Sequence, residues 1–565
     1  MLATMRTVTS IALLLGVAGA TDTGNHPEWP RWCGKVYKPE YASYPSFDPG
    51  GQSTEPPALP DGPALHVQFM PRYNIYLESE TEGEFVVDAG ISKWHGVPWP
   101  KLDTPDDAPP VVFSINLVSN NDVLVSNNVS IDTTGNLFSF NFTGLEPSFD
   151  PYKVVLFGAT ASGAPNVTAE SEFFFLPEKE SGSVTKLDNL HGGFMFRNSK
   201  TKGKFEPLLP YGFYASCDGF LCEDDSKDQI KAYQDLGMNA MVALTEVAKS
   251  TPEFEYMDSI DMKYMYNLRG YFMNLTAVRE QVTAIKDFDS IYSYWGTDEP
   301  DGWQYPFDQP VAAHDLIRSI DPYHPVSITL NCQNYYFKEY TVGADFIMAD
   351  PYPIGINSTF SKWGTECNTT YGDCGCDNCE GNVQDVPRRL DDLARYEAWH
   401  ALWPKTMAHN PQSFHGEDYW FRDPTPAEEV AMNALAFNHR AKSIISWVWP
   451  TSDALASVHG RFSAKVSQTP VRDFIVRGRP QQIKLKCNEV LDAAYWKDGD
   501  KVLLNVVNGG YEPVKKSFKI PLPEAISAKK VSSVVWGNGT WSVKDGEVRL
   551  GPVDAMSTNM MILQL

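Results

Sequence analysis

Residues 290–303 hold side chains whose types and spacing suit acid–base chemistry. The stretch begins with β-branched and aromatic residues, which favour a strand, and then carries two adjacent carboxylates, Asp298 and Glu299, before Pro300. A carboxyl group among apolar rings has a raised pKa, so it stays protonated and can act as a general acid. The same three residues also suit a turn that opens a helix, with the acids near its amino terminus. The first interpretation makes Glu299 a proton donor.

The elements that would position these acids alternate between strands and helices from residue 211 to 449. Such alternation predicts parallel strands, and eight of them predict an α/β fold, the closed (β/α)8 TIM barrel, whose catalytic side chains lie at the carboxyl ends of the strands. The strand candidates are 211–215, 239–244, 263–269, 290–295, 325–331, 345–350, 405–410 and 443–449, and the helix candidates are 226–236, 275–286, 310–320, 387–401 and 426–441. Asp298 and Glu299 then follow the fourth strand.

Several segments resemble a known group of enzymes. YWGTDEPDG at 294–302 resembles the fourth-strand Asn-Glu-Pro of clan A glycoside hydrolases, and ADPYPIG at 349–355 and the segment joining strands seven and eight are also similar to that clan. HGGFMFRN at 191–198 resembles the hairpin that precedes the first strand of such barrels. The likeness covers about residues 185–565. It implies a cofactor-free hydrolase of O-glycosidic bonds, with Glu299 as acid/base and Asp298 where the clan carries an Asn that contacts a sugar hydroxyl.

Glycoside hydrolysis needs a second carboxylate, which acts as a nucleophile or as the base for water. The resemblance implies a Glu at the end of strand seven, but Gln412 stands close to that position, and a Gln cannot attack. We therefore assign Glu417, the nearest carboxylate, as nucleophile or base; Asp350 after strand six and Glu246 after strand two are the other candidates. The amide at 412 also leaves open a barrel that has lost catalysis and serves as a carbohydrate-binding or cell-surface protein.

Other strand ends carry side chains that suit a sugar pocket, although each aromatic ring could equally belong to the core. The resemblance implies that Tyr352 orients the nucleophile and that Trp447 or Trp449 stacks on a sugar ring. The predicted substrate-binding residues are Asp298, Tyr214, Trp295, Trp303, Asp350, Tyr352, Gln412, Trp447 and Trp449, and further candidates for binding hydroxyls are Arg269, Asn331, Gln333 and His409.

The composition of the chain argues against some classes of binding partner. The 565 residues carry a net charge of −24 with no basic cluster, so nucleic acid and anionic membranes are not expected to bind. The sequence has no Gly-rich nucleotide loop, no H-E-x-x-H zinc motif and no G-x-S-x-G nucleophile elbow. We expect a monomer that needs neither cofactor nor metal and whose partner is a carbohydrate substrate.

The amino terminus indicates export from the cell. Residues 1–20 contain Arg6, an apolar core at 11–17 and a small-residue cleavage site at 18–20, which together are typical of a secretory signal peptide. Export predicts a secreted, extracellular glycoprotein. Seven N-x-S/T sequons fit this route: Asn128, Asn141, Asn166, Asn274, Asn357, Asn368 and Asn538.

Nine cysteines are expected to form disulfides in a secreted chain. Cys217 and Cys222 are close enough to close a small loop. Four more, Cys367, Cys374, Cys376 and Cys379, lie within thirteen residues, where a zinc knot is the alternative to disulfides. This cluster falls in an insert, 353–385, on a strand-to-helix loop, so we expect it to form a wall of the site. An odd number of cysteines leaves at least one thiol unpaired.

Strands flank the barrel on both sides. Residues 63–182 contain short strand-like segments separated by turn residues, which predict an N-terminal immunoglobulin-like β-sandwich. Residues 480–565 show the same pattern with Asn-Gly and Asp-Gly turns and predict a C-terminal β-sandwich. The predicted domains are a signal peptide (1–20), an irregular leader (21–62), the N-terminal sandwich (63–182), the catalytic barrel (183–479) and the C-terminal sandwich (480–565).

Overall fold

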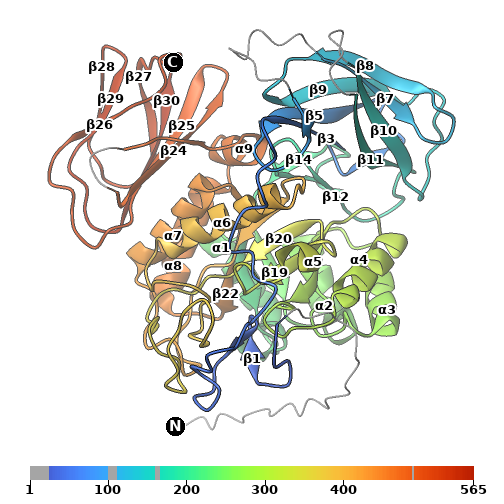
Figure 1. Ribbon diagram of the computed structural model, residues 1–565. Coiled ribbons are helices and arrows are strands. Elements are labelled where there is room, and N and C mark those ends of the chain that lie inside the picture. Colours follow the sequence, from blue (N-terminus) through green and yellow to red (C-terminus); the bar gives the residue numbers. More distant parts are fainter. Residues whose placement is uncertain (1–23, 100–110, 160–165, 486–488) are drawn as a thin grey trace.

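The computed structural model describes residues 24–99, 111–159, 166–485 and 489–565. The predicted signal peptide at 1–20 and Cys487 lie outside the described residues. At the centre is a closed barrel of eight parallel strands whose order follows the sequence, which confirms the predicted (β/α)8 barrel (Figure 1). The strands are β15 (Tyr211–Ala215), β16 (Ala240–Ala243), β17 (Lys263–Asn267), β18 (Ile291–Asp298), β19 (Val326–Leu330), β20 (Phe346–Ala349), β21 (Thr406–His409) and β22 (Ala441–Trp449).

Helices surround this barrel. They are α1 (Ser226–Leu236), α2 (Val247–Ser259), α3 (Leu275–Ile285), α4 (Asp308–Ile320), α5 (Phe337–Thr341), α6 (Asp385–Trp399), α7 (Pro426–Asn438), α8 (Asp453–Val466) and α9 (Val471–Arg477). The sequence pattern missed α2, which contains Pro252 and is kinked at Ser250, and the single-turn α5. It also missed α8 and α9, which follow the last strand. A five-residue π-helical turn, Cys217–Leu221, precedes α1.

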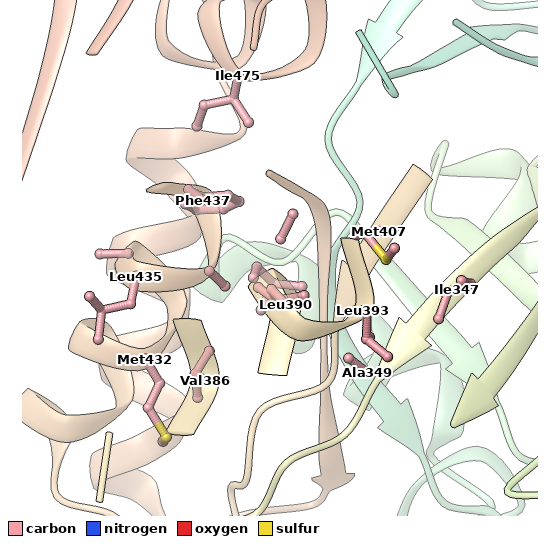
Figure 2. Packing of buried hydrophobic residues seen from close by; sticks show 14 of the residues in the cluster. Ile347, Ala349, Val386, Leu390, Leu393, Met407, Met432, Leu435, Phe437 and Ile475 are labelled. Carbon is pink, nitrogen blue, oxygen red and sulfur yellow. The ribbon is translucent and has the colours of Figure 1, made fainter. Parts of the chain in front are cut away.

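The helices bury apolar side chains against the strands. Val386, Leu390 and Leu393 recur at spacings of four and three residues, so they share one face of α6. Figure 2 shows Leu390 and Leu393 beside Ile347, Ala349 and Met407 of β20 and β21, all in one buried cluster. The outer face of β20 and β21, two strands that lead to predicted site residues, is therefore packed against α6.

A three-stranded sheet closes the amino end of the barrel. It consists of β12 (Val184–Leu187), β13 (Phe194–Arg197) and β14 (Glu206–Leu208). Phe194 packs edge-on against Phe346, with ring centroids 5.2 Å apart, and belongs to the cluster that fills the barrel interior. With this end plugged, the interior can open only at the carboxyl ends of the strands.

The amino-terminal strands form two facing antiparallel-rich sheets, in the order β6-β3-β5-β9 and β4-β11-β10-β7-β8. Their bounds are β3 (Ala64–Pro71), β4 (Ile75–Leu77), β5 (Glu82–Ser92), β6 (Val97–Pro98), β7 (Val111–Leu117), β8 (Val123–Val129), β9 (Thr133–Asn141), β10 (Tyr152–Ala159) and β11 (Val167–Leu176). Phe85, Phe140 and Phe173 pack between the sheets. The sequence pattern did not single out β5 and β8, because their charged, Gly and Asn residues are typical of turns.

The carboxyl-terminal strands form a second pair of sheets, in the order β23-β24-β25-β30-β27 and β26-β29-β28. Their bounds are β23 (Gln481–Gln482), β24 (Leu491–Asp498), β25 (Lys501–Asn508), β26 (Phe518–Ile520), β27 (Lys530–Trp536), β28 (Trp541–Lys544), β29 (Glu547–Leu550) and β30 (Ser557–Gln564). The predicted fold class, a barrel flanked by two β-sandwiches, is confirmed. The domain limits at 62, 182 and 479 remain predictions.

The segment from residue 24 to 62, predicted to be an irregular leader, contains a short β-hairpin. It forms a hairpin of β1 (Arg31–Trp32) and β2 (Lys35–Val36) at the barrel, and Figure 1 shows the chain running from there towards the N-terminal sandwich. A disulfide joins Cys33 of this hairpin to Cys332, which follows β19. The hairpin therefore lies at the carboxyl ends of the barrel strands, where a site is expected.

Three further disulfides join cysteines that are close in sequence. They are Cys217–Cys222, Cys367–Cys374 and Cys376–Cys379. The cluster at 367–379 is thus paired as disulfides, the first of the two alternatives considered. All seven sequon asparagines lie among the described residues and are exposed. No helix within the described ranges is long and apolar enough to cross a membrane.

Candidate active site

A cavity of about 410 Å³ opens at the carboxyl ends of the barrel strands. It brings together eleven of the residues predicted from sequence: Tyr214, Arg269, Trp295, Asp298, Glu299, Trp303, Asn331, Asp350, Tyr352, Glu417 and Trp447. Its other lining residues are Trp32, Thr329, Asp373, Gly375, Phe414, Tyr419 and Trp420. The cavity is therefore a ring of aromatic and carboxyl side chains around the end of β18.

Glu299 follows β18 directly and is held at both ends of its backbone. Its N–H donates to the Thr329 carbonyl (3.0 Å), and its carbonyl accepts from the Trp303 N–H (3.1 Å). Its φ of 45° lies in the left-handed region that glycine favours, and such strained residues gather at functional sites. Asn331 Nδ2 donates to Glu299 Oε1 over 2.9 Å. The backbone hydrogen bonds and the contact with Asn331 thus fix the position of the Glu299 carboxyl group.

Burial raises the pKa of Glu299 well above its usual range, and the nearby Asp350 and Asp298 raise it further because each carries negative charge. Asp350 lies within hydrogen-bonding reach of Glu299, and burial raises its pKa as well. Asp301, behind this pair, has a pKa raised to about 8 by burial, against three backbone N–H groups that donate to it. The cluster therefore holds protons at neutral pH, as a general acid requires.

One side of the cavity is built from stacked rings and a single arginine. The Tyr214 ring lies 4.6 Å from Trp295 and 5.2 Å from Trp447, measured between centroids. Arg269 lies over Trp295 (5.0 Å) and pairs with Asp298 over 3.3 Å. Burial raises the pKa of Asp298, while the charge of Arg269 opposes that rise. Flat apolar faces next to fixed charges are a surface on which a sugar ring can stack and have its hydroxyls bound.

The predicted wall from the 353–385 insert is present. Its Asp373 and Gly375 line the cavity, and Tyr419 from the next loop donates to Asp373 Oδ2 over 2.8 Å. Tyr352 is buried, and its carbonyl accepts from Trp420 Nε1 (2.7 Å). The two loops are therefore joined to each other across the mouth of the cavity.

Glu417 lines the cavity from the loop between β21 and α7. Its backbone is left-handed, with φ of 55°, and the residue is exposed at the rim. Burial of its carboxyl end raises the pKa of Glu417, and the charge of Lys362 and then a hydrogen bond with Trp447 oppose this rise. Of the carboxylates proposed as partners for Glu299, Glu417 and Asp350 reach the cavity, and Glu246 does not; it directly precedes α2, and its carboxylate accepts from Lys249.

Gln412 and Trp449 do not line the cavity, so their predicted sugar contacts are not supported. Gln412 is fully buried and bonds to the N–H and carbonyl of Ile354, both over 2.9 Å, so it holds two loops together. Trp449 packs outside the barrel wall against Phe213 and Tyr233. Their positions near strand ends suggested the site, but the pairing of β15 with β22 is irregular there: Phe213 pairs with Ser446 and Ala215 with Trp449, so a bulge breaks the regular alternation of side chains before Trp449. Gln333 and His409 also lie outside the cavity lining.

Five lining residues were not predicted from the sequence: Trp32, Thr329, Phe414, Tyr419 and Trp420. Trp32 lies more than 170 residues before the first barrel strand, and its one sequence signal is the adjacent Cys33, a candidate for a disulfide whose partner the sequence does not identify. The aromatic run in the loop after β21 was visible, but nothing in it told which rings face inward. In the part of the chain that the structure describes, no three His, Cys, Asp or Glu side chains are arranged to hold a metal ion.

No protein-family model matches the sequence, and a search of curated proteins finds no match. The structure is similar to a β-glucuronidase from Ruminococcus gnavus in complex with D-glucuronic acid (TM-score 0.36, 11% identity, covering 70% of this chain and 68% of that one). It is also similar to a β-D-glucuronidase for Dictyoglomus thermophilum (TM-score 0.32, 11% identity, 74% and 68%). A third is a GH30 endoxylanase from Clostridium papyrosolvens (TM-score 0.39, 11% identity, 63% and 97%). Likeness at this level carries no argument about the reaction of this chain.

Proposed function

We propose that the chain is a secreted glycoside hydrolase of the clan A type, with Glu299 as the general acid and Glu417 as the second carboxylate. The observation that carries this proposal is the cluster of buried carboxyl groups around Glu299 at the floor of an aromatic cavity, where burial and neighbouring acids raise the pKa of Glu299. The predicted signal peptide, the four disulfides and the exposed sequons support export and glycosylation.

In this mechanism Glu299 gives its proton to the glycosidic oxygen as the bond from that oxygen to the anomeric carbon breaks, so the alcohol leaves neutral. Glu417 then either attacks the anomeric carbon and forms a glycosyl ester, or takes a proton from a water that attacks the same carbon. If an ester forms, water cleaves it, and the Glu299 carboxylate takes the proton from that water.

The charges of the cavity favour a neutral sugar. Among its lining residues the carboxyl groups belong to Asp298, Glu299, Asp350, Asp373 and Glu417, and the cation is Arg269, which Asp298 already partners. A uronic acid would bring a carboxylate into a cavity whose lining cation is already paired, so its charge would be desolvated without a partner, which weakens binding. We therefore infer a poly- or oligosaccharide of neutral sugars as substrate.

The proposal is tested by assaying the purified protein on aryl glycosides and on plant and fungal polysaccharides, with Glu299→Gln beside it. The variant keeps the size of the side chain but has no proton to give, so turnover of substrates with poor leaving groups should fall at least about 100-fold. Glu246→Gln is the matched control, because Glu246 lies outside the cavity. Unchanged turnover in Glu299→Gln would refute the assignment.

A second candidate function is carbohydrate binding without hydrolysis. It is favoured by the end of β21, where Asn410 bonds to Tyr214 (2.7 Å) and Gln412 is buried, so no carboxylate stands there. This reading predicts that a glycan which binds tightly is recovered intact after long incubation, and that Glu299→Gln binds it as well as the wild type does.

A further inference from the structure

The β1–β2 hairpin is fixed to the rim of the cavity by several independent contacts. Cys33 is disulfide-bonded to Cys332, and Lys35 forms a buried ion pair with Asp377 of the insert. The Trp32 ring lies edge-on to Trp303, with centroids 5.1 Å apart, and Trp32 lines the cavity itself. The disulfide, the buried ion pair and the ring contact together fix the hairpin in place. They hold the Trp32 indole ring in the wall of the cavity that also contains Glu299.

Trp32 is joined to Glu299 through one intervening side chain. Trp32 Nε1 donates to Asn331 Oδ1 over 2.8 Å, and Asn331 Nδ2 donates to Glu299 Oε1 over 2.9 Å. An indole N–H can only donate, so the atom of the amide that faces Trp32 has to be the oxygen. The amide NH2 is then obliged to face Glu299, and the orientation of the amide is set by Trp32.

The rest of Asn331 is held by other groups. Its N–H donates to Asp301 Oδ1 (3.3 Å), and its carbonyl accepts from Arg389 Nη1 (2.9 Å). The N–H of the next residue, Cys332, donates to Asp301 Oδ2 (2.9 Å). With the backbone fixed in this way, the remaining freedom of Asn331 is the rotation of its amide.

We propose that the amino-terminal hairpin is a working part of the active site, in which Trp32 is a positioning residue that orients the Asn331 amide and so directs an N–H onto one oxygen of Glu299. The Cys33–Cys332 disulfide joins the residue after Trp32 to the residue after Asn331 and holds the two partners together. This inference rests on the proposed function of Glu299.

The orientation of the Asn331 amide determines which oxygen of Glu299 carries the proton. Because Glu299 Oε1 receives an N–H, the proton of the acid is carried by the other oxygen, which is left to face Asp350 or a substrate. If the amide turned over, its oxygen would face Glu299 and accept that proton instead, which favours the protonated acid and makes it a weaker donor. The other charged or titratable groups around Glu299 are Asp298, Asp301, Asp350 and Tyr352, with Arg269 beside Asp298 and Arg389 beside Asp350.

The test is Trp32→Phe, which keeps an aromatic ring in the cavity wall but removes the N–H. The pH midpoint at which Glu299 loses its proton should rise by about half a unit or more, because an N–H that stabilised the carboxylate is lost. The midpoint is read from the infrared band of the protonated carboxyl, identified by its disappearance in Glu299→Gln, and this readout needs no substrate. Trp29→Phe is the control, since Trp29 is in the same segment but stacks on His26 and Tyr41 away from the cavity.

A double-mutant cycle separates orientation from packing. Asn331→Ala should raise the midpoint by itself, and adding Trp32→Phe to it should cause no further shift, because both changes remove the same bond. In a substrate assay the alkaline limb of kcat/KM should move by the same amount, with KM changed little. An unmoved midpoint in Trp32→Phe, or additive shifts in the cycle, would overturn the proposal. If the midpoint moves but no glycoside is hydrolysed, the positioning role stands and the proposed hydrolase function fails.

Discussion

Glu417 is the residue on which the proposed mechanism depends most heavily after Glu299. Its left-handed backbone and that of Asp418, with φ of 55° and 64°, turn the loop so that one side chain enters the cavity and the next points to solvent. Two adjacent non-glycine residues in this region are strained, and strain of this kind gathers at functional sites. The loop therefore gives Glu417 its place at the rim, although no strand carries it there.

Glu417→Gly should abolish hydrolysis of aryl glycosides without harming the fold, because glycine adopts this left-handed backbone with less strain. If Glu417 is a nucleophile, added azide should restore part of the rate and yield a glycosyl azide, measured by mass spectrometry. Asp418→Gly is the matched control, with the same kind of backbone and a side chain that is 85% exposed. Full activity in Glu417→Gly would shift the role to Asp350.

At the scale of elements, α7 ties the catalytic loop to the C-terminal sandwich. Thr425 and Glu428 form a reciprocal capping box, and Pro426 occupies the first turn. The Glu428 carboxylate also accepts from Arg422 of the preceding loop and from Tyr511 of the C-terminal sandwich, each over 2.8 Å. The Glu428 carboxylate therefore joins α7 to the loop that carries Glu417 and to the C-terminal sandwich.

Glu428→Gln should lower the melting temperature at pH 7, and the difference from wild type should shrink as the pH falls towards 3. Burial opposes ionisation, but the bonds from Arg422, Thr425 and Tyr511 outweigh it and lower the pKa of Glu428 to about 2. Because the folded pKa lies below the ordinary value of 4.5, the carboxylate stabilises the fold above pH 4.5 and loses this effect as pH falls through about 2. Glu512→Gln, an exposed neighbour of Tyr511, should change nothing at any pH. An undiminished difference at pH 3 would contradict this role.

The sequence predicted elements better than it predicted which way their side chains face. All eight barrel strands could be found, because buried parallel strands are continuous apolar runs between helical patterns. Trp447 and Trp449 show where this fails: both lie in β22, two residues apart, yet one lines the cavity and the other packs outside the barrel, because the strand pairing is irregular between them. The position of Trp32 in the site could not be predicted from the sequence, because it depends on the disulfide partner of Cys33, which cysteine spacing alone does not identify.

At the scale of the whole molecule, the cavity is assembled from segments far apart in sequence. Its walls come from the hairpin at Arg31–Val36, from the barrel strand ends and from the 353–385 insert, and disulfides hold the hairpin and the insert. The two sandwiches pack elsewhere on the barrel (Figure 1). The shape of the site is therefore a property of the oxidised chain.

Peptide mapping of the protein without reduction should recover four linked pairs: Cys33–Cys332, Cys217–Cys222, Cys367–Cys374 and Cys376–Cys379. The pairing within 367–379 is the informative one, because a zinc knot would use the same four thiols. Mass spectrometry after alkylation distinguishes the two states, since free thiols gain the label and bridged ones do not. Labelled cysteines together with bound zinc would contradict the disulfide assignment.

The link between Cys33 and Cys332 also sets an order of events during biosynthesis. The two cysteines are separated by 299 residues, so at ~5–20 residues per second the first waits roughly 15–60 s for its partner to be synthesised. Cys217 and Cys222 emerge earlier and can react with the waiting thiol, so the pairing within the short 217–222 loop must form first or be repaired later. Trp32 reaches the rim only after β19 exists, which makes completion of the cavity one of the last steps in the maturation of this chain.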